Sequence, residues 1–108
     1  MYRKQERGKG FRRLLANAAP MKYVLFYESA PDVATKAPLY AAEHTARWHG
    51  IRERGELLMI GPFANPAEGA MGIFTTREAA EAFVSGDPFV RNGVVVSWRI
   101  AEWMEAIV

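Results

Sequence analysis

The sequence contains no cysteine among its 108 residues. This absence excludes disulfides, thiol catalysis and thiolate metal sites, and it makes a reducing cytoplasm the default location. No apolar run is long enough to span a bilayer, so no membrane partner is expected. Half of the residues are apolar and 12% are aromatic, which is typical of a soluble globular chain. At this length we expect one domain with a two-layer core.

Basic residues are concentrated in the first twenty positions. Residues 1–20 carry six Lys and Arg residues against Glu6, whereas residues 21–108 carry eight basic and eleven acidic residues. The sequence predicts a basic, disordered N-terminal extension over 1–20 and an acidic domain over 21–108. The domain shows no basic face with interleaved aromatic residues, so we expect no nucleic-acid partner.

The basic extension has three interpretations: a disordered tail, an Arg-rich targeting peptide, or a leader upstream of a working start at Met21. The last is favoured, because Met21 opens a predicted strand at once and Pro20 separates that strand from everything before it.

Apolar runs and turn signals predict four strands and two helices. Pro38 suits the first turn of the first helix, which Gly55 ends. Thr75 and Glu78 form a capping box for the second helix, and Gly86 ends it in a left-handed conformation. The expected strands cover 23–27, 57–60, 69–74 and 94–100, the helices cover 39–54 and 77–84, and an apolar tail covers 101–108.

The order of these elements is βαββαβ, the split βαβ arrangement of ferredoxin-like folds. The predicted fold class is α+β, with a four-stranded antiparallel sheet and two helices on one face. The opposite face of the sheet keeps apolar residues, more than a monomer usually exposes. We therefore expect a homodimer that stacks sheet against sheet, assisted by Trp98, Trp103 and Met104.

Asp87 and His44 form the candidate acid-base pair. Pro88 restricts Asp87 to an extended conformation, and Phe89 can anchor this turn in the core. Helical spacing places His44 on the inward face of the first helix, so the carboxylate could fix its tautomer and leave the other ring nitrogen free. Each residue also has a structural interpretation, Asp87 as an Asx turn and His44 as a satisfied core histidine.

The inward face of the first helix also carries Tyr40 and Trp48, which are the candidate pocket residues. His49 falls on the opposite face from His44, so the two cannot share an ion and no metal site is expected. A haem axial role for His44 remains an alternative.

Residues 21–103 resemble the YciI-like (YCII-related domain) family. The resemblance begins at Met21-Lys22-Tyr23-Val24-Leu25 and covers about four fifths of the chain. Its other carriers are His44 with Gly55 eleven residues later, Leu57-Leu58 before Gly61-Pro62, Arg77-Glu78-Ala79-Ala80, Asp87-Pro88-Phe89, Gly93-Val94-Val95 and Trp103.

The resemblance implies a dimeric α+β barrel in which His44 and Asp87 form an active-site pair, and Gly61 and Pro62 shape the wall of the cleft. It also implies a fold like that of muconolactone isomerases, with some relatives acting on chlorinated ring products. One departure concerns substrate charge: many relatives place an Arg shortly before the histidine, whereas this chain has none there, and Arg47 is the candidate replacement.

Two functions follow. The first is an enzyme without a cofactor, in which His44, oriented by Asp87, moves a proton on a small cyclic or carbonyl-bearing substrate during an isomerase, lyase or dehydrohalogenase step. The second is a non-catalytic dimeric module that binds a small molecule or docks a partner. An imidazole nitrogen of His44 that faces an open pocket favours the enzyme, and one sealed in the core favours the module.

Overall fold

The computed structural model describes residues 21–107. The prediction for residues 1–20 lies outside this part. The described chain forms an α+β fold with a four-stranded antiparallel sheet in the order β2-β3-β1-β4, which confirms the predicted ferredoxin-like class. The elements are β1 (Met21–Ser29), α2 (Val33–Glu53), β2 (Leu57–Pro62), the 3-10 helix η1 (Pro66–Glu68), β3 (Ala70–Phe74), α3 (Arg77–Gly86), α4 (Pro88–Arg91) and β4 (Val95–Met104).

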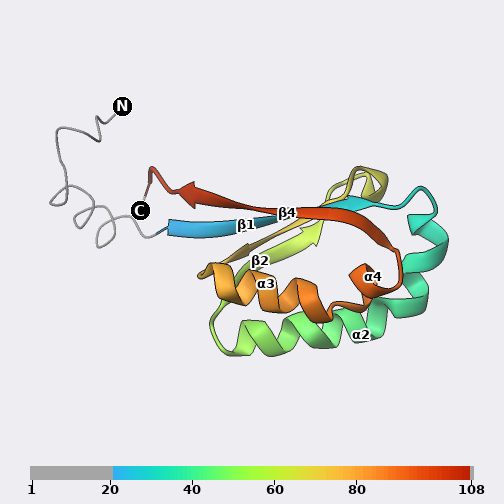
Figure 1. The fold of residues 1–108 in the computed structure, drawn as a ribbon, viewed down its shortest axis with the longest axis horizontal. Helices are drawn as coiled ribbons and strands as arrows, with labels where there is room; N and C mark the ends of the chain where they lie inside the picture. Colours follow the sequence, from blue (N-terminus) through green and yellow to red (C-terminus); the bar gives the residue numbers. More distant parts are fainter. Residues whose placement is uncertain (1–20, 108) are drawn as a thin grey trace, which may run out of the picture.

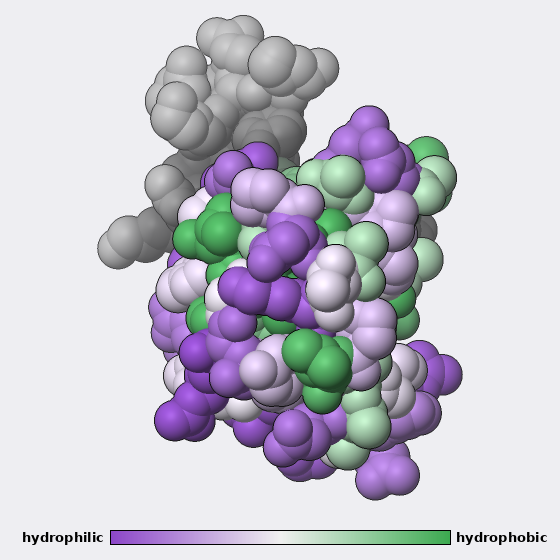
Figure 2. Space-filling model, turned by 90° about the vertical axis from the view of Figure 1, so that its right-hand side faces the viewer, coloured by the Kyte–Doolittle hydropathy of each residue, from purple (hydrophilic) through white to green (hydrophobic). Residues whose placement is uncertain are grey.

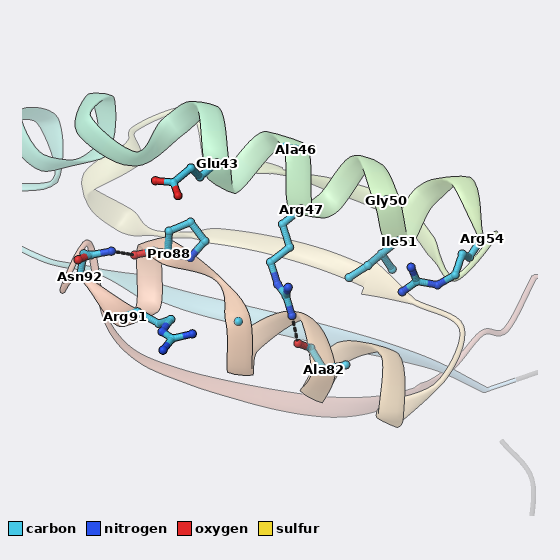
Figure 3. A pocket seen from close by; sticks show the side chains of 11 residues that line it. Glu43, Ala46, Arg47, Gly50, Ile51, Arg54, Ala82, Pro88, Arg91 and Asn92 are labelled. Carbon is cyan, nitrogen blue, oxygen red and sulfur yellow. Dashed lines mark hydrogen bonds between the residues drawn. The ribbon is translucent and has the colours of Figure 1, made fainter.

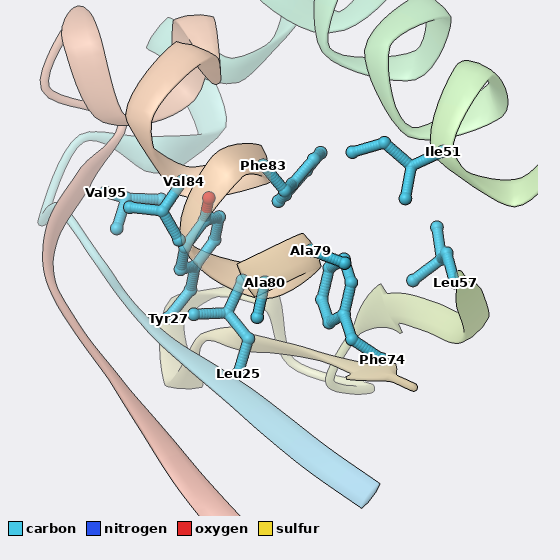
Figure 4. Close-up of a cluster of buried hydrophobic side chains, with 10 residues drawn as sticks. All are labelled: Leu25, Tyr27, Ile51, Leu57, Phe74, Ala79, Ala80, Phe83, Val84 and Val95. Atoms are coloured by element: carbon cyan, nitrogen blue, oxygen red, sulfur yellow. The ribbon is translucent and has the colours of Figure 1, made fainter. Parts of the chain in front are cut away.

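The fold has two layers, with the helices on one side of the sheet (Figure 1). The core between them joins apolar side chains from β1, β3, α2 and α3, where Phe74 and Phe83 are fully buried (Figure 4). Ala79 and Ala80 on α3 let this helix approach the sheet closely. This packing fixes the positions from which the inward side chains of α2 and β1 project.

The first helix begins earlier than predicted. It starts at Val33, so Pro38 lies inside it and not in its first turn. Proline removes the hydrogen bond that the carbonyl of Ala34 would accept, but Ala34 is exposed and water can replace that bond. The end of the helix is as predicted, because Gly55 has a φ of 79°.

The second helix also differs in its ends. Its N-cap is Thr76, whose side chain accepts a hydrogen bond from the backbone N–H of Ala79, so the predicted capping box at Thr75 is wrong by one residue. Gly86 lies within the helix and has no positive φ, so its predicted left-handed conformation is also wrong. The helix ends because Pro88 keeps Asp87 extended, at φ −71° and ψ 121°.

Within residues 21–107, the helices lie on one side of the sheet and leave its outer face without a helical layer (Figure 1). Strand β4 continues to Met104, so the first half of the predicted tail, 101–104, is strand. Trp103 lies opposite Lys22 on this outer face, whereas Trp98 pairs with Tyr27 and therefore faces the helices. Within residues 21–107, no helix has both the length and the hydropathy that a bilayer crossing requires.

Candidate active site

Asp87 lies at the junction of α3 and α4, and its side chain is completely buried. Pro88 occupies the first position of α4, and Asp87 is the N-cap of that helix. Its Oδ1 accepts a hydrogen bond from the backbone N–H of Phe89 at 3.0 Å. The predicted Asx-type interaction is therefore present, but it accounts for only part of the carboxylate's hydrogen bonding.

Two further donors reach the same carboxylate from other elements. Tyr27 on β1 donates its hydroxyl to Oδ2 of Asp87 at 2.7 Å. Nδ1 of His44 on α2 lies 2.8 Å from Oδ1. A buried carboxylate is tolerated only where hydrogen bonds replace its hydration, and these three donors supply them. The predicted meeting of His44 and Asp87 is thus observed, and it includes a tyrosine that the sequence interpretation did not assign to the site.

Tyr27 remains a donor because its environment opposes ionisation. Burial raises the pKa of its hydroxyl far above the usual value, and the charge of the Asp87 carboxylate raises this pKa further. The strand period held a signal for this residue, since Tyr27 lies two positions after Leu25 and shares its inward face. What the sequence could not reveal is that the hydroxyl reaches the α3–α4 junction.

His44 is held in one orientation by its ring contacts. Its ring stacks on that of Phe89 with centroids 3.8 Å apart and an interplanar angle of 6°, and it meets the ring of Phe83 edge-on at 5.8 Å. The Asp87 carboxylate can only accept hydrogen bonds. In the neutral imidazole of His44, Nδ1 therefore carries the proton that is donated to Asp87. The lone pair of the neutral ring is then on Nε2.

The second ring nitrogen of His44, Nε2, is the one that Asp87 does not hold. The side chain is 16% exposed, and Nε2 has no hydrogen-bond partner within residues 21–107. No side-chain nitrogen or oxygen of these residues is both buried and without a partner, so Nε2 lies within reach of solvent or ligand. A histidine that acts as a general base requires such an arrangement, with one ring nitrogen held by a carboxylate and the other accessible.

His44 borders a mainly apolar cavity of about 460 Å³ between α2 and the inner face of the sheet. Of the four candidate pocket residues, Trp48, Gly61 and Pro62 line this cavity, whereas Tyr40 is not among its lining residues. The wall also includes Leu25, Tyr27, Val33, Thr45, Ile60, Met71, Gly72, Phe89 and Val95. Pockets of this size with few polar groups are typical of small-molecule sites.

Arg47 does not face this cavity. Its Nε donates to the carbonyl of Phe83 at 3.1 Å, and its Nη2 donates to the carbonyl of Ala82. Figure 3 shows the guanidinium in a separate groove between α2 and α3. Arg47 is therefore not placed to contact a ligand in this cavity, and its donors satisfy carbonyls near the C-terminal end of α3.

His49 lies away from the pair. It is exposed and stacks on Trp48, with ring centroids 4.2 Å apart. Among residues 21–107, no group of three His, Cys, Asp or Glu side chains is arranged to hold a metal ion.

Comparisons with known proteins agree with this geometry at the level of the fold. A family model described as the YCII-related domain matches residues 21–104. No protein with a curated description matches the chain. The solved structure of 5-chloro-2-hydroxyhydroquinone dehydrochlorinase (TftG) from Burkholderia phenoliruptrix AC1100, in complex with 2,5-dihydroxybenzoquinone, is similar with a TM-score of 0.65. The two share 16% identity over 79% of this chain and 95% of the other.

Proposed function

The chain belongs to the YCII-related domain family, and from this premise we propose that it is a cofactor-independent enzyme in which His44 is the general acid-base and Asp87 orients it. The substrate is a small cyclic or carbonyl-bearing molecule that enters the cavity beside α2. The observation that carries the proposal is Nε2 of His44 beside that cavity: it has no hydrogen-bond partner among the described residues, while Nδ1 of the same ring is held by a buried carboxylate. The non-catalytic binding module predicts a sealed imidazole, so this observation favours the enzyme.

The proposed step moves one proton. Nε2 accepts a proton from an acidic O–H or C–H of the substrate, and the imidazolium that forms is stabilised by Asp87. In an isomerisation, Nε2 returns the proton to another carbon. In a dehydrohalogenation, the electron pair left on the substrate expels the halide, which departs with the bonding electrons. One positioned group supplies about 10²- to 10⁴-fold in rate, which suits substrates whose proton is already acidic.

The structural neighbour indicates a class of substrate to test first. TftG is named as a dehydrochlorinase of a chlorinated hydroxyhydroquinone, and its structure holds 2,5-dihydroxybenzoquinone. A ring of that size suits a cavity of about 460 Å³ whose wall includes Trp48 and Phe89. In this proposal Trp48, Gly61 and Pro62 contact the substrate.

The test uses 5-chloro-2-hydroxyhydroquinone together with a panel of chlorinated hydroquinones and small cyclic ketones. Chloride release and uptake of solvent deuterium are followed for the wild type, for His44→Ala and for the control His49→Ala. We expect turnover that only the His44 change removes. Turnover that survives His44→Ala refutes the role of this residue. Ligands that bind in the cavity without any turnover across the panel favour the binding module.

We also propose that two copies associate through the outer face of the sheet. Met59 and Trp103 on this face are 66% and 45% exposed, and Phe26 lies between β3 and β4 on the same face. By contrast, the end of the molecule in Figure 2 shows hydrophobic side chains separated by hydrophilic ones. Analytical ultracentrifugation of the wild type and of Trp103→Lys tests this, with a dimer expected for the wild type and a weaker one for the variant.

A further inference from the structure

The cavity beside His44 differs from most of the surface in its lack of charge. Within the described residues 21–107, no Asp, Glu, Lys or Arg lines it. Its ionisable lining residues are His44 and Tyr27, and the hydroxyl of Tyr27 is already donated to Asp87. We infer that the cavity selects substrates that are uncharged when they bind and rejects the same ring bearing a carboxylate. This inference rests on the proposed function, because it concerns the ligand of that site.

The cationic groups nearest to the site in sequence are used elsewhere. Arg47, one turn after His44, donates to carbonyls of α3 in the separate groove. Nζ of Lys36, one helical turn before Tyr40, lies 3.7 Å from Oδ2 of Asp32, and Lys36 is not among the residues that line the cavity. A carboxylate inside the cavity would therefore lose its hydration and gain no permanent counter-charge.

The imidazole cannot serve both as a counter-charge and as a base. A bound carboxylate would be stabilised by His44 only in its protonated form, in which Nε2 no longer has a lone pair. Such a ligand would remove the base that the reaction requires. A neutral substrate has no such conflict, because charge appears only when its proton moves to Nε2, and the buried Asp87 then stabilises the imidazolium.

The wall of the cavity also suits a flat ligand. His44 and Phe89 are parallel within 6° and belong to the same wall, while Trp48 adds a further aromatic surface from α2. Offset stacking on such surfaces favours planar rings without requiring any charge. The selected class is therefore a neutral planar ring or ring ketone.

The test compares acetophenone with 4-acetylbenzoate, which differ by one carboxylate. Each is titrated at pH 8 into the full chain, and the NMR signals of the His44 ring and the Trp48 indole report entry into the cavity. We expect acetophenone to shift these signals and 4-acetylbenzoate to bind on the order of 100-fold more weakly, since its carboxylate would be buried without a partner.

A charge introduced into the wall should reverse this preference. Thr45 lines the cavity directly after His44. Thr45→Lys should raise the affinity for 4-acetylbenzoate by about 10-fold or more by providing a counter-charge, whereas Thr45→Met, of similar length, should not. Thermal unfolding of both variants verifies that they remain folded.

The outcomes separate this inference from the proposed function. Binding of 4-acetylbenzoate to the wild type as tightly as acetophenone overturns the inference and leaves the site standing. If acetophenone binds, 4-acetylbenzoate does not, and the substrate panel shows no His44-dependent turnover, the inference is supported and the proposed enzymatic function is refuted. If neither probe shifts the signals of His44 and Trp48, the inference is refuted, and the proposed function is still decided by His44-dependent turnover of the substrate panel.

Discussion

Two hollows lie on either side of α2, and they differ in how their polar groups are used. The groove between α2 and α3–α4 is the larger, at about 820 Å³, and is lined by Glu43, Arg47, Arg54 and Arg91 among others. The cavity between α2 and the sheet measures about 460 Å³, and the described residues that line it include no Asp, Glu, Lys or Arg. Size and charge would favour the groove as the functional site.

The hydrogen bonds favour the cavity instead. In the groove, Arg47 donates to two backbone carbonyls of α3, and Arg54 pairs with Glu56 at 3.2 Å. Arg47 thus joins α2 to α3, and the pair of Arg54 and Glu56 is exposed to water. Beside the cavity, the buried Asp87 accepts hydrogen bonds from three donors, one of them His44, whose side chain lines the mainly apolar wall. A titratable group that is held in one orientation, with one polar atom left for a ligand, identifies a functional site better than the volume of the hollow does.

The largest expected effect separates the two hollows directly. His44→Gln, in the cavity, should lower turnover by about 10²- to 10⁴-fold, because the amide cannot accept a proton. Arg91→Ala, in the groove, should leave turnover unchanged, since the Arg91 side chain does not line the cavity and alanine keeps the backbone hydrogen bond to the carbonyl of Asp87. The rate of chloride release or deuterium uptake measures both. A loss in Arg91→Ala that matches the loss in His44→Gln would move the site to the groove.

Asp87→Ala should produce the next largest effect, on stability as well as on the site. It leaves the donors of Tyr27, His44 and Phe89 without an acceptor, and unsatisfied buried donors cost about 1–3 kcal/mol each. We expect the free energy of unfolding to fall by about 3–5 kcal/mol in urea titrations.

The same variant tests how His44 is oriented. Long-range ¹H–¹⁵N NMR spectra should show a proton on Nδ1 in the wild type and a mixture of tautomers in Asp87→Ala. If Nδ1 keeps the proton in the variant, the carboxylate does not determine the tautomer.

The sequence carried enough information for the fold and for the contact between His44 and Asp87. Strand and helix periods are local, so the apolar runs predicted the order βαββαβ, and the inward position of His44 followed from helical spacing. Asp87 could be located because Gly86 and Pro88 flank it, and Pro88 restricts its backbone whatever the tertiary structure.

The remaining features depend on contacts between elements that no local pattern encodes. Tyr27 joins the site only because β1 passes beneath the α3–α4 junction, 60 residues later in the chain. Arg47 turned away from the cavity because the carbonyls of α3 lie within its reach. Gly86 is explained by the same contact, since a methyl group at this position would collide with the Arg47 guanidinium.

A substitution at Gly86 tests whether Arg47 is structural. Gly86→Ala should destabilise the fold by about 1–3 kcal/mol, because the guanidinium must move away from the added methyl group and lose its hydrogen bonds to the carbonyls of Ala82 and Phe83. In an Arg47→Ala background the same change should stabilise the fold by about 0.5–1 kcal/mol, since Gly86 is helical and alanine is the better helix former. Urea unfolding of the wild type, the two single variants and the double variant gives the coupling free energy between Gly86 and Arg47. The same sign of effect in both backgrounds would show that the two residues are not coupled.

The smallest expected effect concerns Tyr27 and appears at alkaline pH. Burial raises the pKa of Tyr27 in the folded state, so above pH of about 10 the unfolded chain loses this proton while the folded chain keeps it. The unfolded state then binds fewer protons, and the free energy of unfolding should fall by about 1.4 kcal/mol per pH unit from this group.

Tyr27→Phe should lose about 1–2 kcal/mol of unfolding free energy at neutral pH through the missing hydrogen bond to Asp87. It should also show a shallower alkaline slope, by about one proton, in urea unfolding measured between pH 9 and about 11. Equal slopes in the two proteins would mean that Tyr27 ionises as readily when folded as when unfolded, and its hydroxyl could not then be a permanent donor to the carboxylate that orients His44.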